Sequence, residues 1–377
     1  MKKIKSFILA TMAIAFVAPV FTACSDDDKN ETINNIVSEY EVNDKMVAAQ
    51  KAQSKKDVAV LLVAFGSTWN NAFLAFDKTK AAYEAAFPQA DVYVSFSSDI
   101  CINRASAGEN SDDEGNIVKR DYYEPRYLLH AIGAAKYSKI YVQSLQVIPG
   151  EEFAAVVASV KKFMNNGYIA SAHLDDKYLA KLSDDEAIFL GMPLLDNPDV
   201  DVPEVAKQLN ALYASEVQQG AVAFMGHGNP DKYDTFKANI RYTQLEEALQ
   251  AMNPNYFVGT VDMDGNLKMD VLERMRDKGI DDGKLYLHAL MSIAGDHAHN
   301  DMAGEGDEYW SHPMAPDHEE NSWFEFFKHS GYETIVPVTK NHPLGLLELP
   351  GVLNVWIQHT KNAEFLEDAY HSMYPEE

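Results

Sequence analysis

The chain has 377 residues, of which 57 are acidic and 32 are basic, so its formal net charge is −25. This excess of negative charge argues against nucleic acid as a partner, because the phosphates would be repelled. The chain has two cysteines, Cys24 and Cys101, which excludes a zinc site built from four cysteines. The length beyond the N-terminal segments exceeds that of one typical core and predicts two domains.

Residues 1–23 have the pattern of a lipoprotein signal peptide. Three lysines precede an apolar stretch, residues 7–20, which is shorter than the roughly 20 residues of a bilayer span. The small-residue run that follows ends at Cys24 and resembles a bacterial lipobox, whose cysteine is acylated after cleavage. The resemblance implies lipidation of Cys24, which would leave no internal disulfide. An ordinary cleaved signal that happens to contain a cysteine is the alternative.

Residues 24–56 are predicted to form a flexible tether that could hold one weak helix, because their charges are scattered and aromatic residues are few. Three aspartates, residues 26–28, follow Cys24 directly. Such a run is either a solvated part of the tether or, as in some Gram-negative lipoproteins, a mark for export to the cell surface. We therefore expect a cell-envelope protein, periplasmic or at the outer membrane or surface, that contacts the membrane through its lipid anchor only.

The predicted N-terminal domain, residues 57–218, alternates apolar strands with helices. Val58 to Phe65 is a continuous apolar run closed by Gly66, as expected of a strand buried on both faces of a parallel sheet. Thr68 is predicted to cap the helix that follows, and Pro88 to halt it. The strands are predicted at 58–65, 91–98, 139–148 and 187–195, and the helices at 68–87, 125–135, 153–166 and 203–218; residues 105–125 read as irregular.

The predicted C-terminal domain, residues 219–377, repeats this order. Its strands are predicted at 221–225, 256–261, 284–293 and 334–338, with helices at 234–252 and 271–278, an apolar segment at 323–327, and a helical tail at 353–369. Lys139 to Leu145 matches Lys284 to Leu290 at an offset of 145 residues, and the Gly-acid ending that follows each strand matches too.

The fold class predicted from this pattern is α/β, with two similar domains that arose by internal duplication. Each domain would be an open parallel sheet flanked by helices. Ligands of such sheets bind beyond the carboxyl ends of the strands, so two facing domains would form a cleft there.

Three strand ends of the C-terminal domain carry side chains that bind metals. His227, Asp262 and His297 follow the strands predicted at 221–225, 256–261 and 284–293. His227 is flanked by glycines, which would let backbone on both sides approach a ligand. Two imidazoles and a carboxylate suit Fe, Co, Ni or Zn and leave positions open for a reacting partner. A satisfied polar side chain at a strand end is the alternative for each residue.

These residues carry a resemblance to the anaerobic-pathway cobalt chelatases that act on sirohydrochlorin, within the class II chelatase fold shared with ferrochelatase. The matching stretches are LLVAFGS (61–67), QSLQVIPGEEF (143–153), GMPLL (191–195), FMGHG (224–228), VGTVD (258–262), AGDHA (294–298) and NDM (300–302). The resemblance implies a metal chelatase whose ligands are His227, Asp262 and His297. Asp262 departs from the family's usual Glu, and residues 310–320 look inserted.

The resemblance also implies a mechanism. Two pyrrole N–H protons must leave as the metal enters, so His227 is predicted to be both ligand and base, with Glu152 as proton relay or metal-delivery group. The carboxylates of sirohydrochlorin require local cations on this acidic protein; Arg104 matches a family arginine, and Ser67 and Thr68 begin a helix whose N–H groups could bind a carboxylate.

Three functions stay open at this point. The first is insertion of Co²⁺ into a tetrapyrrole such as sirohydrochlorin, in cobalamin-type biosynthesis or salvage. The second is an exported metal- or haem-binding lipoprotein that has the chelatase fold without turnover. The third is an iron chelatase of the same superfamily. Ligand type does not select Co²⁺ over Fe²⁺, Ni²⁺ or Zn²⁺. The sequence is also compatible with a homo-oligomer.

Overall fold

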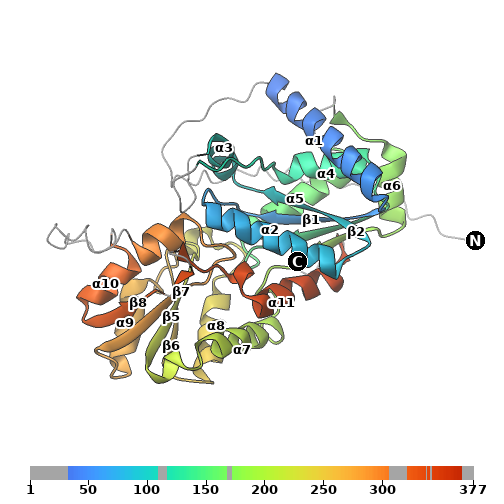
Figure 1. Ribbon diagram of the computed structural model, residues 1–377. Helices are drawn as coiled ribbons and strands as arrows, with labels where there is room; N and C mark the ends of the chain where they lie inside the picture. The colour runs from blue at the N-terminus through green and yellow to red at the C-terminus, as the bar shows by residue number, and fades with distance from the viewer. Residues whose placement is uncertain are drawn as a thin grey trace, which may run out of the picture.

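The computed structural model describes residues 33–108, 117–167, 172–304, 321–336, 338–339 and 342–366. Two main β-sheets lie in separate lobes, each with helices on both faces (Figure 1). A third sheet is an antiparallel pair of two-residue strands, β9 (Val338–Thr339) and β10 (His342–Pro343). The first main sheet has the order β11-β4-β3-β1-β2, where β11 is Glu364–Phe365, and its first four strands in the chain pair in parallel. These strands are β1 (Val58–Ala64), β2 (Ala90–Phe96), β3 (Lys139–Ser144) and β4 (Ile188–Gly191).

The second sheet repeats the first. Its order is β6-β5-β7-β8, and every pair is parallel. Its strands are β5 (Gly220–Gly226), β6 (Tyr256–Thr260), β7 (Gly283–Ala289) and β8 (Tyr332–Ile335). The β2-β1-β3-β4 order of the first sheet therefore matches β6-β5-β7-β8, and β3 and β7, the strands related by the offset of 145, hold the same place. The predicted fold class is confirmed, and the matching order supports duplication.

Both faces of each sheet are covered by helices. In β1, Ala59, Leu61 and Val63 face one apolar cluster while the alternate residues face another, as a strand between two helical layers requires. The helices are α2 (Asn70–Ala86), α3 (Asp99–Ala107), α4 (Pro125–Ala134), α5 (Glu151–Met164), α6 (Asp176–Asp184), α7 (Asp201–Tyr213), α8 (Ile240–Gln250), α9 (Lys268–Asp277), α10 (Trp323–His329) and α11 (Pro350–Lys361).

Three of these helices, α3, α6 and α10, were not predicted, and each begins at a local cap. At α10 the Ser322 side chain accepts from the Glu325 N–H at 3.1 Å. The Ser98 side chain accepts a hydrogen bond from the Cys101 N–H at the start of α3, and Gly108 ends that helix with φ +75°. Asp175 caps α6 in the same way, through the Lys177 N–H. The prediction that Thr68 caps α2 is wrong, because Trp69 holds the N-cap position.

Two helices pack across the predicted domain boundary at 218/219. α7 precedes the boundary but packs on the second sheet, where the Tyr213 hydroxyl lies 2.7 Å from Nδ1 of His288. α11 follows the boundary but packs on the first sheet, where Thr360 Oγ1 donates to Gln143 Oε1 at 2.7 Å. The predicted helical tail at 353–369 ends at Lys361, because β11 (Glu364–Phe365) then pairs antiparallel with β4. Because α7 and α11 each pack on the other lobe, one apolar cluster is continuous across both lobes.

Residues 24–56 were predicted as a flexible tether that could hold one weak helix, and the described part, from residue 33, is a helix packed on the domain rather than a tether. Residues Ile33–Ser54 form α1, a 22-residue helix that packs on α4 (Figure 1). Tyr40 and Val47, seven residues apart, lie on one face and are 4% and 0% exposed. The sequence signal is weak because only a few apolar residues mark this buried face, which needs its tertiary partner to form.

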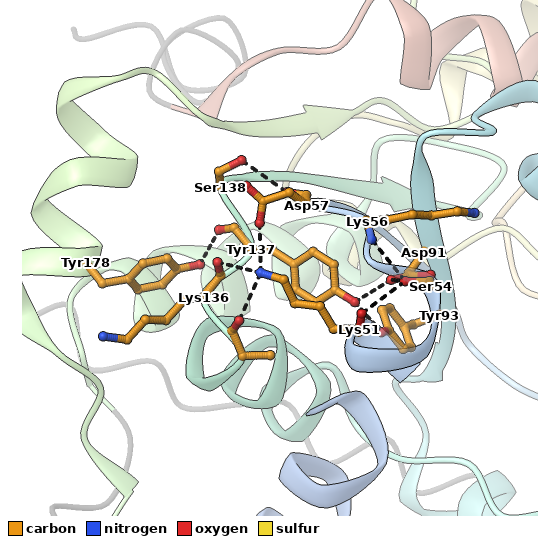
Figure 2. Close-up of polar contacts among 11 residues, drawn as sticks. Lys51, Ser54, Lys56, Asp57, Asp91, Tyr93, Lys136, Tyr137, Ser138 and Tyr178 are labelled. Atoms are coloured by element: carbon orange, nitrogen blue, oxygen red, sulfur yellow. Dashed lines mark hydrogen bonds and ion pairs between the residues drawn. The ribbon is translucent and has the colours of Figure 1, made fainter. Parts of the chain in front are cut away.

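Polar contacts fix the C-terminal end of α1 on the first domain (Figure 2). Lys51 donates to the carbonyls of Ala135 and Lys136 at 3.0 and 2.8 Å and pairs with Asp57 at 2.8 Å. Asp91, 2% exposed, accepts from Ser54 Oγ at 2.7 Å and from the Tyr137 hydroxyl at 2.6 Å. α1 is thus part of the folded domain.

None of the helices in the described ranges is both long and apolar enough to cross a bilayer. The predicted signal peptide, Cys24 and the predicted insertion at 310–320 lie outside the described residues.

Candidate metal-insertion site

His227 follows the last residue of β5, and its local packing orients the ring. Its Nδ1 lies 2.7 Å from the Gly228 carbonyl, so Nδ1 carries the proton and Nε2 is left for a metal. The glycines on either side of His227 were predicted to let backbone approach a ligand, but other side chains of the protein pack against them. A Cβ on Gly226 would lie 2.4 Å from the Tyr242 ring, and Gly228, with φ +73°, lies against Thr260 and Met263.

Asp262 is brought to His227 by the backbone beyond β6. Its N–H donates to the His227 carbonyl at 2.9 Å, which continues the β5–β6 pairing past the strand ends. As a result, Asp262 Oδ2 lies 3.8 Å from His227 Nδ1. Both side chains are partly open, at 42% exposure for His227 and 44% for Asp262.

His297 begins η4 (His297–Ala303), the short helix after β7. Its ring lies 4.6 Å from that of His227, centroid to centroid, at an interplanar angle of 85°. Asp301, four residues on, lies 2.5 Å from His297 Nδ1. This hydrogen bond raises the pKa of His297, although burial opposes it, and leaves Nε2 as the metal-binding nitrogen. The role of Asp301 was missed, although its i,i+4 spacing from a histidine was a signal.

Glu152 comes from the first domain and faces the histidines. It stands in the second position of α5, at the place that duplication equates with His297. Surrounding protein raises the pKa of Glu152, and the nearby His227 and His297 act in the opposite direction. Glu152 is exposed to solvent, which moderates this rise in its pKa. The adjacent Glu151 accepts from the N–H and hydroxyl of Thr235 at 2.8 and 3.0 Å, which ties the two domains together beside the site.

The side chains at this site are of the types that bind a divalent metal ion. The two imidazoles present unblocked Nε2 atoms, with carboxylates from Asp262 and Glu152 close by, which suits a divalent transition metal. Across the described residues, no three His, Cys, Asp or Glu side chains are already arranged around one metal position.

The predicted tetrapyrrole-binding residues lie at the same edge of the first sheet. Ser67 and Thr68 are buried, and Ser67 Oγ accepts from the Trp69 N–H at 3.2 Å. They precede α2, which begins at Asn70, so the prediction that they begin this helix is wrong. Arg104 is half-buried in α3, one turn after Cys101, whose Cβ lies 2.8 Å from where a Cβ on Gly66 would stand. Of the three, only Arg104 has a side chain that is not fully buried. A separate cavity of about 380 Å³ between α1 and α4 contains none of the predicted site residues.

A two-lobed α/β protein with two imidazoles and a carboxylate at the strand ends of one lobe, and a glutamate facing them from the other, has the architecture of a metal chelatase. Residues 58–364 match the family described as Cobalt chelatase (CbiK), and the chain belongs to this family. The predicted resemblance is thus confirmed.

Two relatives and one solved structure are similar to the chain. The chain is 27% identical over 302 residues to "Sirohydrochlorin cobaltochelatase CbiKC" of Nitratidesulfovibrio vulgaris, a match that covers 80% of this chain and 88% of that protein. It is 27% identical over 257 residues to "Sirohydrochlorin cobaltochelatase" of Salmonella typhimurium, covering 67% and 82%. The solved structure "SirB from Bacillus subtilis with Fe3+" aligns with a TM-score of 0.47 at 13% identity, over 83% of this chain and 98% of that one.

Proposed function

We propose that this protein inserts Co²⁺ into sirohydrochlorin or a closely related tetrapyrrole, with both metal and ring as substrates. The observation that carries the proposal is the His227–His297 ring pair at 4.6 Å, with Nδ1 of each ring engaged and Nε2 left for a metal. The names of the two relatives supply the metal and the ring.

The reaction exchanges one M²⁺ for two pyrrole protons. His227 and His297 hold the ion, and Asp262 adds a carboxylate beside His227. When Nε2 of His227 releases the metal to the tetrapyrrole, this nitrogen accepts the proton that a pyrrole nitrogen loses. Glu152 faces this point from the other domain with a raised pKa, which makes its carboxylate a stronger base than an ordinary glutamate. Glu152 then passes protons to water in the cleft.

An insertion assay tests the proposal. The soluble chain with Cys24 replaced by serine is mixed with sirohydrochlorin and Co²⁺, Fe²⁺, Ni²⁺ or Zn²⁺ in turn, and the visible spectrum is followed. We expect insertion well above the uncatalysed rate, fastest with Co²⁺. Fastest insertion of Fe²⁺ would make the protein an iron chelatase. The absence of catalysis with all four metals would replace the proposal with a metal- or haem-binding protein.

We further propose that the protein is anchored in the cell envelope through a lipid on Cys24. The support is the sequence alone, a basic segment and a short apolar stretch that end in small residues before the cysteine. The anchor would place the catalytic domain at a membrane surface, joined to α1 by the short segment between Cys24 and Ile33.

Replacing Cys24 with serine is expected to move the protein from the membrane fraction to the soluble fraction, because the acylated thiol is lost. Immunoblots of fractionated cells measure this. Cys101→Ser is the matched control and should leave the protein in the membrane, since Cys101 lies in α3 of the folded domain. Membrane retention of Cys24→Ser equal to that of the wild type would contradict the lipid anchor.

A further inference from the structure

Trp69 of the first domain contacts the segment of the second domain that carries His297. Its Nε1–H donates to Asp296 Oδ1 at 2.5 Å, with the two residues 227 positions apart in the chain. Its indole also stacks on the His299 imidazole, with ring centroids 3.6 Å apart and planes 7° apart. One side chain thus makes a polar and a stacking contact with the opposite domain.

These two contacts stand on either side of His297. Asp296 precedes it, and His299 follows two residues later in η4. A Cβ on Gly295 would lie 3.4 Å from Ser67 Oγ, so Gly295 lies against the Ser67 side chain. His299 is held in turn by its own segment, through Nδ1 and the Gly295 carbonyl at 2.9 Å. The stretch from Gly295 to His299 is therefore packed against the loop after β1.

This packing matters because the site draws on both domains. His227 and His297 belong to the second domain and Glu152 to the first. The His297 ring is partly exposed and has Asp301, from its own helix, as its hydrogen-bond partner. Without the first-domain contact, the Gly295–His299 stretch would sample more positions, and a ligand pair is weakened when its members are not held in place.

We propose that Trp69 is a positioning residue, which bonds Asp296 and stacks on His299 so that His297 is held at metal-sharing distance from His227. This inference rests on the metal-binding role of the two histidines in the proposed function. Trp69 acts on His297 through the segment that it holds, by its contacts with Asp296 and His299.

The test is equilibrium binding of Co²⁺ alone, without tetrapyrrole, to the soluble chain. Trp69→Ala is expected to weaken Co²⁺ binding about tenfold, since it removes a hydrogen bond to a carboxylate and a stacked ring. Trp69→Phe keeps a stacking face and should lose about threefold. Asp296→Asn keeps an acceptor oxygen and should stay close to the wild type. The visible d–d bands of bound Co²⁺ should broaden or shift in Trp69→Ala, a change that a purely structural role would not produce.

Leu74→Ala, an exposed position on the same helix, is the matched control and should bind Co²⁺ like the wild type. In turnover, Trp69→Ala should raise the KM for Co²⁺ more than it lowers kcat. Unchanged Co²⁺ affinity and d–d bands in Trp69→Ala would overturn the inference. The Co²⁺-binding measurement needs no turnover. If the wild-type protein failed to insert metal, the proposed function would be wrong, but Co²⁺ binding would still test the role of Trp69.

Discussion

Replacing His227 with alanine is expected to lower the rate of Co²⁺ insertion by at least about 100-fold, because the variant loses a metal ligand and the base closest to it. His227 and His297 lie 4.6 Å apart, so the loss leaves one imidazole to hold the ion with Asp262. Titration of the apo-protein with Co²⁺ measures the ligand role, and initial rates of insertion measure the role in turnover.

The two roles separate at saturating Co²⁺. If His227 also accepts ring protons, excess metal should restore occupancy of His227→Ala without restoring the rate. Full rescue of the rate by Co²⁺ would make His227 a ligand only. His297→Ala should show a comparable loss of affinity, whereas His299→Ala, which removes the stacking partner of Trp69, should lose much less. His173→Ala, an exposed histidine of the first domain, is the control and should behave like the wild type.

The fold could be predicted because its strands are buried on both faces. Continuous apolar runs such as Val58–Ala64 mark parallel strands without any knowledge of their partners, and the β3–β7 match gave the repeat. The predicted ligands followed from the same reasoning, since parallel strands bring their carboxyl ends to one edge. The structure places His227, Asp262 and His297 together at that edge, and Glu152 opposite them.

What could not be predicted depends on partners distant in the chain. Trp69 meets Asp296 only after the two domains pack together, and β11 finds β4 only because α11 crosses back to the first sheet. The glycines beside His227 were assigned to ligand approach, yet the Tyr242 ring and Thr260 fill that space. α1 was predicted as no more than a weak helix within a tether, because the groups that hold it, such as Asp91 and the Ala135 carbonyl, lie 37 or more residues away.

Replacing Asp91 with alanine is expected to lower the free energy of unfolding by about 3 kcal/mol. The carboxylate is 2% exposed and accepts from Gln50 Nε2, Ser54 Oγ and the Tyr137 hydroxyl, at 3.1, 2.7 and 2.6 Å. Alanine would leave the fully buried Tyr137 hydroxyl without this acceptor, where water reaches it poorly, whereas the exposed Gln50 and the partly buried Ser54 can turn to water. Urea denaturation followed by circular dichroism measures the change.

The matched control is Asp57→Ala, which removes the other carboxylate at the end of α1. Asp57 is 59% exposed in its pair with Lys51, so water screens the ion pair and the loss should stay below about 1 kcal/mol. Asp91→Asn should fall between the two, because the amide keeps one acceptor oxygen but turns donors toward Ser54 or Tyr137. Equal small losses for Asp91→Ala and Asp57→Ala would show that α1 is held by its apolar face on α4, through Tyr40 and Val47, rather than by this buried carboxylate.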